Sequence, residues 1–499
     1  MYAVRKIFDF ARQTPDAPAF IANLQPVSYR AFHERISALR GRLAERGLRR
    51  GGIVMVWIDT IAVAWTVDLA LRTLGLTTVA IRSIAEIGDF AGLDVVALAT
   101  FDAEPRPGAA AALPPGVAEI VVAAADWEPA ETGGELEPPP GEPPGGHILL
   151  TSGSTGQYKM VLVNEAFEAV HNAALTDFQL GGEDEPAIDE WLLRVNLFNF
   201  GLWTVAGYST PIRRWSRGGA VVFHQGPGIV RSLAVAGLTH AVITPAGLIR
   251  ILEAPADALP RNDALRLVVA GGPLSLSLAN RARAALTNHI FTALGSTESG
   301  VWAVTPIETA DDLRWHRLHP GRTVEVVDEA HQPLPPGQLG QVRILLDNGL
   351  TGYLGAPEAT AQAFRDGYFY PGDLGVLDGR GRLALYGRVT EVINVLGDKI
   401  ATQPFELALQ DALGVEGVCL VSEQGAEGGE ELHVIVETAT PIDAATLRDA
   451  ALATLHGFAD ARFHFIDRFP RNHMGKVERF KLRKALIELR RGKAADADA

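Results

Sequence analysis

The chain has 499 residues, 47% of them hydrophobic and 21% charged, which is typical of a globular protein with two or more domains. Its 45 basic and 59 acidic residues give a net charge of −14, which argues against a general nucleic-acid binder and against a protein that binds anionic membranes. The single cysteine, Cys419, excludes an intramolecular disulfide and suits a reducing compartment.

The first part of the chain shows neither a secretory signal nor a membrane span. Residues 1–20 lack the continuous apolar core of a secretory signal. The apolar stretch over 53–81 is interrupted by Asp59, Asp68 and Arg72, so it predicts a strand, a helix and a second strand instead of a membrane span. We therefore expect a cytoplasmic protein.

Strand and helix patterns alternate through the first two thirds of the chain, which predicts a parallel sheet and an α/β architecture. Further short apolar runs typical of buried strands lie at 95–99, 119–123, 220–223, 241–244 and 267–270. After about residue 320, strands joined by Gly and Pro turns predict a smaller β-rich unit at 323–328, 340–346 and 382–386. The end of the chain predicts a compact α+β unit, with strands near 418–422 and 432–437 and a helix over about 477–491.

The segment over 149–159 reads LLTSGSTGQYK and predicts a site for phosphate groups. After an apolar run it contains six consecutive small or hydroxylated residues: Thr151, Ser152, Gly153, Ser154, Thr155 and Gly156. Small residues let the backbone turn tightly and bring N–H groups close to an anion, hydroxyls add donors, and Lys159 adds a positive charge. The spacing differs from that of a Walker loop. Taken alone, the segment also fits a flexible surface turn.

Four more polar segments interrupt the apolar pattern further along the chain. They read LGSTE at 294–298, YPGDL at 370–374, GR at 387–388 with IN at 393–394, and PRNHMGK at 470–476. Together and in this order, these motifs resemble the adenylate-forming superfamily of acyl- and aryl-CoA synthetases, peptide-synthetase adenylation domains and luciferases. The resemblance extends over nearly the full length of the chain.

The resemblance implies how the chain is divided. It implies a large N-terminal domain over 1–387, made of parallel-sheet α/β subdomains and a β-rich subdomain, that holds ATP and the acyl pocket. A small, mobile α+β domain over 388–499 would carry the catalytic lysine. In thioester-forming members this small domain swings after adenylation, which would move Lys476 out and bring the loop at Gly397 beside the acyl-AMP.

The resemblance also implies the residues that bind ATP and Mg²⁺. The loop from Thr151 to Lys159 resembles the one that holds the β- and γ-phosphates as pyrophosphate leaves, with Thr155 and Lys159 in catalytic roles. Glu298 resembles the Mg²⁺ ligand, and a hard oxygen donor suits this ion; the alternative is a solvated carboxylate at a turn. Asp373 and Arg388 resemble the ribose contacts. The segments that would border the nucleotide contain Gly271, Gly272, Pro273, Leu294, Gly295, Ser296 and Thr297.

Lys476 resembles the catalytic lysine that bridges the substrate carboxylate and the α-phosphate. A carboxylate that attacks a phosphate brings two anions together, so a cation between them stabilises the transition state more than the separated reactants. The alternative is that Lys476 is one more charge in a basic segment, because basic residues outnumber acidic ones over 462–493.

Several residues depart from the family pattern. Tyr158 and Met160 flank Lys159 where the family has Pro and Gly, Leu294 stands where an aromatic residue commonly stacks on adenine, and Thr390 occupies the hinge position. These departures predict a divergent enzyme, and a non-catalytic homologue that binds nucleotide or acyl groups stays open.

The acyl pocket is expected around Phe198, Asn199, Phe200 and Trp203. No acidic residue lies between 192 and 210 to pair with a substrate ammonium, so an α-amino acid is disfavoured. The aromatic side chains favour a flat ring or an aliphatic chain. Asn199 falls where a related aryl-acid group bonds an ortho-hydroxyl, which favours an aryl acid over a fatty acid; the alternative is an asparagine that satisfies local backbone.

We therefore expect an ATP- and Mg²⁺-dependent ligase that forms an acyl-AMP from an aryl or fatty acid, releases pyrophosphate and passes the acyl group to CoA. The alternative acceptor is the phosphopantetheine of a separate acyl-carrier protein.

Overall fold

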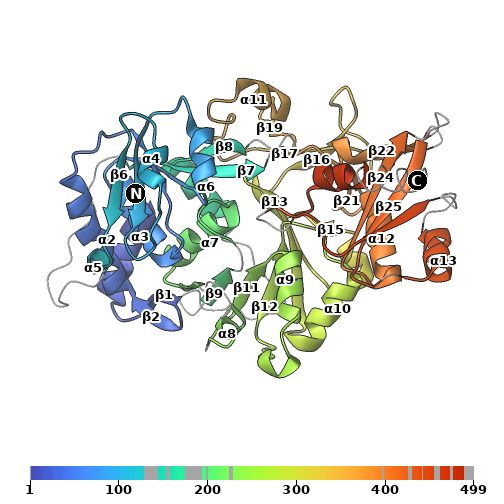
Figure 1. Cartoon of the computed structure of the whole chain (residues 1–499), viewed down its shortest axis with the longest axis horizontal. Helices are drawn as coiled ribbons and strands as arrows, with labels where there is room; N and C mark the ends of the chain where they lie inside the picture. The colour runs from blue at the N-terminus through green and yellow to red at the C-terminus, as the bar shows by residue number, and fades with distance from the viewer. Residues whose placement is uncertain are drawn as a thin grey trace, which may run out of the picture.

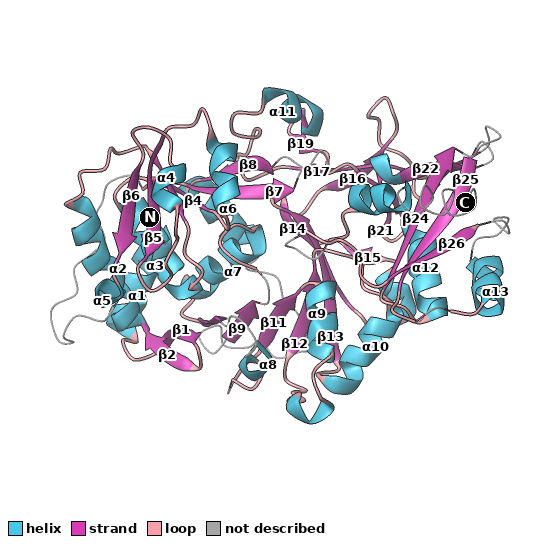
Figure 2. Ribbon diagram, in the orientation of Figure 1, coloured by secondary structure: helices cyan, strands magenta, loops and turns pink. Residues whose placement is uncertain are grey.

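The computed structural model describes most of the chain, and Figures 1 and 2 show it from the same side. The described residues are 2–127, 144–152, 158–174, 194–197, 200–223, 229–235, 237–395, 398–424, 430–440, 442–454, 461–472 and 476–487. Within these ranges, no helix combines the length and the apolar character needed to cross a bilayer.

A six-stranded sheet in the N-terminal part runs in the order β6-β5-β3-β4-β7-β8. Its strands are β3 (Ile53–Val56), β4 (Thr77–Ala80), β5 (Val95–Phe101), β6 (Ala118–Val122), β7 (His147–Ser152) and β8 (Tyr158–Val163). All neighbours are parallel except β7 and β8, which form an antiparallel pair. The crossover helix α3 (Ile61–Thr73) joins β3 to β4, and all its residues except the first are buried. A helix buried on every side lies in the interior of a larger core.

An eight-stranded sheet forms the second layer and runs in the order β14-β13-β12-β11-β9-β10-β1-β2. Its strands are β1 (Pro18–Ala22), β2 (Gln25–Ser28), β9 (Arg194–Leu197), β10 (Ala220–Phe223), β11 (His240–Ile243), β12 (Arg266–Ala270), β13 (His289–Ser296) and β14 (Gly300–Pro306). The central pairs are parallel, and the β1–β2 and β13–β14 pairs at the two edges are antiparallel. The β13–β14 hairpin reaches the centre of the molecule in Figure 2.

The helices around these sheets pack against them in three hydrophobic clusters. The longer ones are α1 (Tyr2–Gln13), α2 (Tyr29–Ala44), α6 (Glu165–Ala174), α7 (Val205–Trp215), α9 (Pro245–Leu252) and α10 (Leu276–Ala285). Shorter helices and 3-10 turns are η1 (Ile84–Phe90), α4 (Ala109–Ala112), α5 (Ala124–Trp127), α8 (Ile229–Ser232), η4 (Ala256–Ala258) and η5 (Ala310–Leu313). Trp65 of α3 meets Trp215 of α7 edge to face, with ring centroids 4.9 Å apart, so the two sheets' helices interlock.

A polar network is fully enclosed where α3, α6 and α7 meet the start of β7. Arg72 donates to Glu168 at 2.6 Å and to the Gly145 carbonyl oxygen at 3.1 Å. His147 Nδ1 lies 2.8 Å from Asp68 Oδ1, and His147 Nε2 lies 2.9 Å from the carbonyl oxygen of Leu202. Each charged side chain in this network therefore has an opposite charge close by.

An antiparallel seven-stranded sheet follows, with β16 paired to β17 beside the main order β15-β21-β20-β17-β19-β18. Its strands are β15 (His316–Arg317), β16 (Val324–Val327), β17 (Gly340–Leu345), β18 (Phe364–Arg365), β19 (Tyr368–Phe369), β20 (Asp373–Leu377) and β21 (Arg382–Arg388). Helix α11 (Pro357–Ala363) lies between β17 and β18 in the chain.

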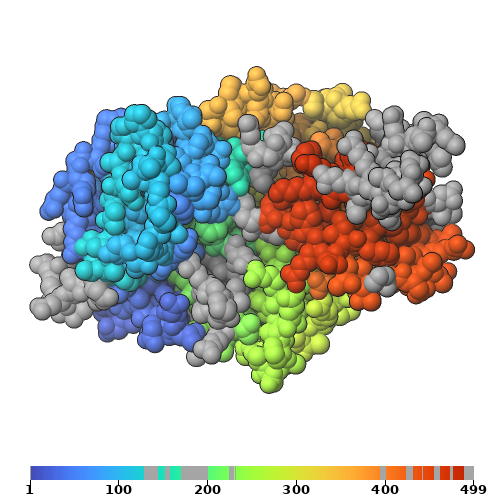
Figure 3. Space-filling model, in the orientation of Figure 1, coloured from blue at the N-terminus to red at the C-terminus, as the bar shows by residue number. Residues whose placement is uncertain are grey.

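The C-terminal part has its own two small cores. It contains η6 (Val389–Glu391), the pair β22 (Val392–Val395) and β23 (Asp398–Ala401), the sheet β24 (Gly417–Gln424), β25 (Glu430–Glu437) and β26 (Arg462–Ile466), helices α12 (Gln403–Leu413) and α13 (Ala444–Thr454), and a helix over 479–487. Figure 3 shows this orange and red part against the green lobe that carries α9 and α10.

The predicted strands are present with small shifts at their ends, and the mixed α/β architecture is confirmed. The three antiparallel edge pairs of the two large sheets, β7–β8, β1–β2 and β13–β14, were not predicted, because a single short apolar run does not reveal the direction of its partner.

Candidate active site

Glu298 lies in the turn between β13 and β14 and is 5% exposed. The Tyr353 hydroxyl donates to Glu298 Oε1 at 2.7 Å. The Asn348 side-chain amide donates to the backbone carbonyl oxygen of Glu298, also at 2.7 Å. Both partners come from the segment that follows β17, so one loop holds this residue by its side chain and by its backbone.

Lys159 reaches the same place from the six-stranded sheet. Its Nζ lies 4.9 Å from the centroid of the Tyr353 ring, and its β8 strand is held to the same loop because the Leu354 N–H donates to the Met160 carbonyl oxygen at 2.8 Å. Burial, followed by the carboxylate of Glu298, raises the pKa of Tyr353, so the phenol stays protonated and donates its hydrogen bond.

The predicted phosphate loop leaves the sheet at this point. Thr151 and Ser152 end β7, and Thr151 pairs with Lys159 across the β7–β8 hairpin. The predicted residues Gly153, Ser154, Thr155 and Gly156 lie outside the described residues. The hairpin nevertheless fixes where the loop begins and ends, next to Tyr353.

Asp373 and Arg388 face each other across β20 and β21. Arg388 Nε lies 3.1 Å from Asp373 Oδ1, and the guanidinium also donates to the Pro371 carbonyl oxygen. Burial raises the pKa of Asp373, and the positive charges of Arg388 and Lys476 partly oppose this rise. The turn before Asp373 contains Gly372 at φ +80°, a conformation that favours glycine.

Lys476 brings the C-terminal part to the same cluster of charges. Its backbone N–H donates to the Asn472 side chain at 3.0 Å. The residue as a whole is exposed to solvent, but protein atoms crowd its surroundings. This crowding and then the charge of Arg388 lower the pKa of Lys476, against the opposing influence of Asp373, Glu298 and Glu391. The structure thus brings together Glu298, Asp373, Arg388 and Lys476.

The predicted nucleotide-border residues are placed in two turns. Gly271, Gly272 and Pro273 are exposed directly after β12. Leu294, Gly295 and Ser296 end β13, and Thr297 follows in the turn that leads into Glu298. A Cβ atom on Gly295 would come within 2.5 Å of the Gly300 carbonyl oxygen, so the hairpin requires glycine there.

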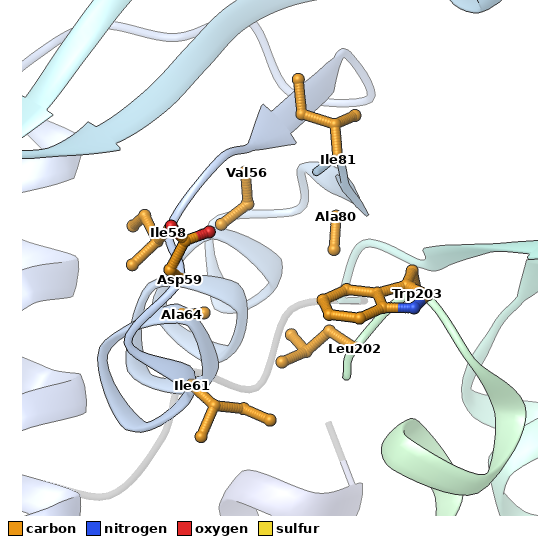
Figure 4. Close-up of a pocket in the computed structure, with 9 residues that line it drawn as sticks. All are labelled: Val56, Ile58, Asp59, Ile61, Ala64, Ala80, Ile81, Leu202 and Trp203. Atoms are coloured by element: carbon orange, nitrogen blue, oxygen red, sulfur yellow. The ribbon is translucent and has the colours of Figure 1, made fainter. Parts of the chain in front are cut away.

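The predicted acyl pocket is only partly described. Phe198 and Asn199, like Gly397 of the predicted thiol-side loop, lie outside the described residues. Phe200 is buried in the shared core, and Trp203 is half-buried. Trp203 lines a small hollow at the carboxyl ends of β3 and β4 (Figure 4). The hollow is otherwise lined by Val56, Ile58, Asp59, Ile61, Ala64, Ala80, Ile81 and Leu202. None of the clustered charged residues Glu298, Asp373, Arg388 and Lys476 lines it.

The sequence did not single out several residues that the structure places at the site. Tyr353 and Asn348 hold Glu298, and Glu391 of η6 acts electrostatically on both Asp373 and Lys476. Arg82 donates to the Tyr158 hydroxyl at 2.5 Å, and its guanidinium lies 5.7 Å from the Trp203 ring. The sequence marks this region only by the turn residues Asn348 and Gly349 after a predicted strand, and such residues do not indicate which side chain they contact.

Known proteins resemble this chain in sequence and in structure. A family model described as AMP-binding enzyme matches residues 7–354. The fatty acid–acyl-carrier-protein ligase ScoC of Streptomyces coeruleorubidus is 30% identical over 355 residues, which are 67% of this chain and 66% of that protein. A 2-succinylbenzoate–CoA ligase of Bacillus licheniformis is 28% identical over 357 residues, 67% of this chain and 69% of that protein. The matched segment thus spans about two thirds of the length of each of these relatives.

The structural comparison extends over more of the chain. The o-succinylbenzoate CoA synthetase MenE of Bacillus subtilis, solved with its acyl-adenylate intermediate, has a TM-score of 0.78 at 20% identity and covers 96% of this chain and 97% of that one. This likeness confirms the predicted fold class. Because the family model matches more than half of its residues, the chain belongs to the AMP-binding enzymes, the adenylate-forming superfamily that its motifs resemble.

Proposed function

We propose that the chain is an AMP-forming acid–thiol ligase. In the first half-reaction a carboxylate oxygen attacks the α-phosphorus of ATP, and acyl-AMP forms as pyrophosphate leaves. In the second, a thiol attacks the acyl carbon, loses its proton and releases AMP. The observation that supports this proposal is the convergence of Glu298, Asp373, Arg388 and Lys476, which come from three parts of the fold.

The donor set suits Mg²⁺ and the phosphates of ATP. Glu298 is a buried carboxylate, and only its Oε1 has a hydrogen-bond partner among the described residues, so Oε2 is available as a hard oxygen ligand. Bound Mg²⁺ would neutralise negative charge on the β- and γ-phosphate oxygens. Lys159 and the loop that starts at Thr151 would hold the same phosphates, since backbone N–H groups and a lysine are typical phosphate donors.

Asp373 and Arg388 would bind the ribose, with the carboxylate accepting hydrogen bonds from its hydroxyls. Lys476 would lie between the substrate carboxylate and the α-phosphate and stabilise the charge that accumulates there. These roles support a large domain over 1–387 and a small domain over 388–499 that carries Lys476. A later movement of the small domain would bring the loop at Gly397 to the thiol.

We propose CoA as the acceptor and an aryl acid as the substrate, with a fatty acid or a separate acyl-carrier protein as the alternatives. The two relatives reported above use different acceptors, since one is named for an acyl-carrier protein and the other for CoA. Phe198, Asn199, Phe200 and Trp203 would line the acyl pocket. The lone buried Cys419 supports a cytoplasmic location.

Exchange of labelled pyrophosphate into ATP tests this proposal directly. We expect acid-dependent exchange when purified protein is screened against benzoate-like and fatty acids at saturating Mg²⁺. Mass spectrometry of the products with CoA, and in parallel with a phosphopantetheinylated carrier protein, then identifies the acceptor. Exchange with none of the acids, together with measurable ATP binding, would instead support a nucleotide-binding homologue without turnover.

A further inference from the structure

We infer that Tyr353 is a positioning residue that aligns Glu298 and Lys159 with each other, and that this alignment sets the Mg²⁺ requirement of the first half-reaction. The inference rests on the proposed function and adds to it a residue that touches neither the acid nor the reacting phosphate. It is carried by two contacts that one side chain makes to two predicted catalytic residues.

The first contact fixes the carboxylate. Tyr353 is 8% exposed and Glu298 5%, so their 2.7 Å hydrogen bond is sheltered from water. A hydrogen bond from a protonated phenol to one oxygen restricts rotation of the carboxylate and leaves the second oxygen to accept a ligand. Asn348 restrains the backbone of the same residue at its carbonyl oxygen. The Glu298 side chain therefore has a defined direction before any ligand arrives.

The second contact places the ammonium group. Lys159 Nζ lies 4.9 Å from the ring centroid of Tyr353, within the range in which a cation is attracted to an aromatic face. Among the described residues Lys159 has no carboxylate within ion-pair distance, so the ring is its partner there. The phenol thus holds a cation on its face and an anion at its hydroxyl.

Tyr353 is itself held firmly enough to act in this way. Its N–H donates to the Thr360 hydroxyl at 2.9 Å, and its ring meets Phe364 edge to face with centroids 5.1 Å apart. The next residue, Leu354, is hydrogen-bonded to the backbone of β8. These contacts tie Tyr353 to α11 on one side and to the strand that carries Lys159 on the other.

A purely structural role of Tyr353 and a positioning role predict different effects of the same variants. If Tyr353 only filled space, Tyr353→Phe would leave the Mg²⁺ requirement nearly unchanged. Its Mg²⁺ requirement would then match that of Phe364→Leu, which loosens the same ring without touching Glu298. If Tyr353 positions Glu298 through its hydroxyl, Tyr353→Phe changes the Mg²⁺ requirement and Phe364→Leu does not. Tyr353→Leu then removes the contact to Lys159 as well.

The experiment measures pyrophosphate exchange against Mg²⁺ concentration at fixed ATP for wild type, Tyr353→Phe, Tyr353→Leu, Phe364→Leu and Glu298→Gln, with the thermal midpoint of each. We expect Tyr353→Phe to raise the Mg²⁺ concentration for half-maximal rate by about tenfold, as for loss of a partner next to a metal ligand. Tyr353→Leu should in addition raise the KM for ATP. Thioester formation from supplied acyl-AMP should stay near the wild-type rate in Tyr353→Phe.

A double variant shows whether the effect passes through Glu298. In a Glu298→Gln background, Tyr353→Phe should add no further increase in the Mg²⁺ requirement. A full additional increase in the Mg²⁺ requirement of the double variant would overturn the inference. So would an unchanged Mg²⁺ curve for Tyr353→Phe alone, or an equal shift of that curve in Phe364→Leu.

The inference can be tested even if the proposed function fails. If wild type exchanges pyrophosphate with none of the acids, calorimetric titration of ATP at low and high Mg²⁺ replaces the rate measurement. A tenfold weaker Mg²⁺ effect on ATP binding in Tyr353→Phe would then support the positioning role. Identical Mg²⁺ dependence in the two proteins would overturn it.

Discussion

Two groups of charged side chains in this molecule differ in how they are paired. In the enclosed network around α3, Arg72 lies 2.6 Å from Glu168, and His147 lies 2.8 Å from Asp68. Around the candidate site, three charged side chains have no oppositely charged partner among the residues that the structure describes. Within the described part of the chain, no ion-pair partner lies within 4.0 Å of Glu298, Lys159 or Lys476.

The difference separates charges that are neutralised within the fold from charges that are left for a ligand, and Asp373 and Arg388 belong to the first kind, because they pair with each other at 3.1 Å. Of the three, Glu298 is buried, and a buried charge without a partner is costly, so a fold keeps it where a ligand or a metal ion supplies the missing charge. The phosphates of ATP and a Mg²⁺ ion would complete the site as Glu168 and Asp68 complete the network. Removing a charge should therefore cost stability in the first group and activity in the second.

The largest effect is expected in the enclosed network. Arg72→Met would leave the Glu168 carboxylate buried without its cation, and we expect the free energy of unfolding to fall by about 3–5 kcal/mol. Denaturant unfolding measures this change. The double variant Arg72→Met/Glu168→Leu, which removes both charges, should recover a large part of the loss, and a single variant as stable as wild type would contradict the assignment.

Lys476→Ala should show the reverse behaviour. We expect pyrophosphate exchange to fall by about 10²–10³-fold, as for loss of one preorganised charge, without any loss of stability, because the folded state disfavours the charged form of Lys476. Thioester formation from supplied acyl-AMP should be retained. Lys481→Ala is the matched control, since Lys481 lies on the adjacent helix and pairs with Glu478 at the surface. Equal losses in both half-reactions would show that Lys476 has another role.

The pH dependence of the first half-reaction should show that the pKa of Lys476 is lowered. Because its pKa is lowered, the alkaline limb of pyrophosphate exchange should begin below the value of about 10.4 for an ordinary lysine. Lys476→Arg keeps its charge and should move that limb upward. The linkage to stability has the matching sign: folding disfavours the protonated lysine, so wild type gains stability relative to Lys476→Met as pH rises from the lowered pKa toward 10.4. A limb at the ordinary value would contradict this account.

The smallest effect is expected where the C-terminal part contacts α10. The Asp411 carboxylate accepts hydrogen bonds from the backbone N–H groups of Leu276 at 3.4 Å and Ser277 at 3.1 Å. Asp411→Asn weakens this exposed contact, which favours the position in which Lys476 reaches the site, so exchange should fall roughly two- to tenfold. Asp263→Asn, at another surface ion pair, is the control. An equal decrease in thioester formation would show that the contact does not select one half-reaction.

The sequence revealed those parts of the molecule that depend on local pattern. A strand and a following helix in the stretch over 53–81 were predicted because apolar residues and their spacing are visible in a short window, and the structure has them at Ile53–Val56 and Ile61–Thr73. Glu298, Asp373 and Lys476 were predicted because polar residues interrupt apolar segments in a family order. Their convergence is consistent with that prediction, while their individual roles stay predictions.

Tyr353 was not found because its function depends on a partner 55 residues away. A tyrosine is apolar enough to look like core, so its hydroxyl gives no signal in the sequence. Arg72 and Glu168 were hidden for the same reason, since their pairing joins two helices 96 residues apart. The residues at Gly153, Thr155, Phe198, Asn199 and Gly397 lie outside the described ranges and stay predictions.

The placement of Tyr353 between two strands of different sheets has a consequence for how the chain folds. Lys159 belongs to the six-stranded sheet, Glu298 to the edge hairpin of the eight-stranded sheet, and Tyr353 to the loop after β17. Such contacts close long loops, and in a chain of this size they form after the local elements have collapsed. We therefore expect the candidate site to form late in folding and to be lost early on partial unfolding.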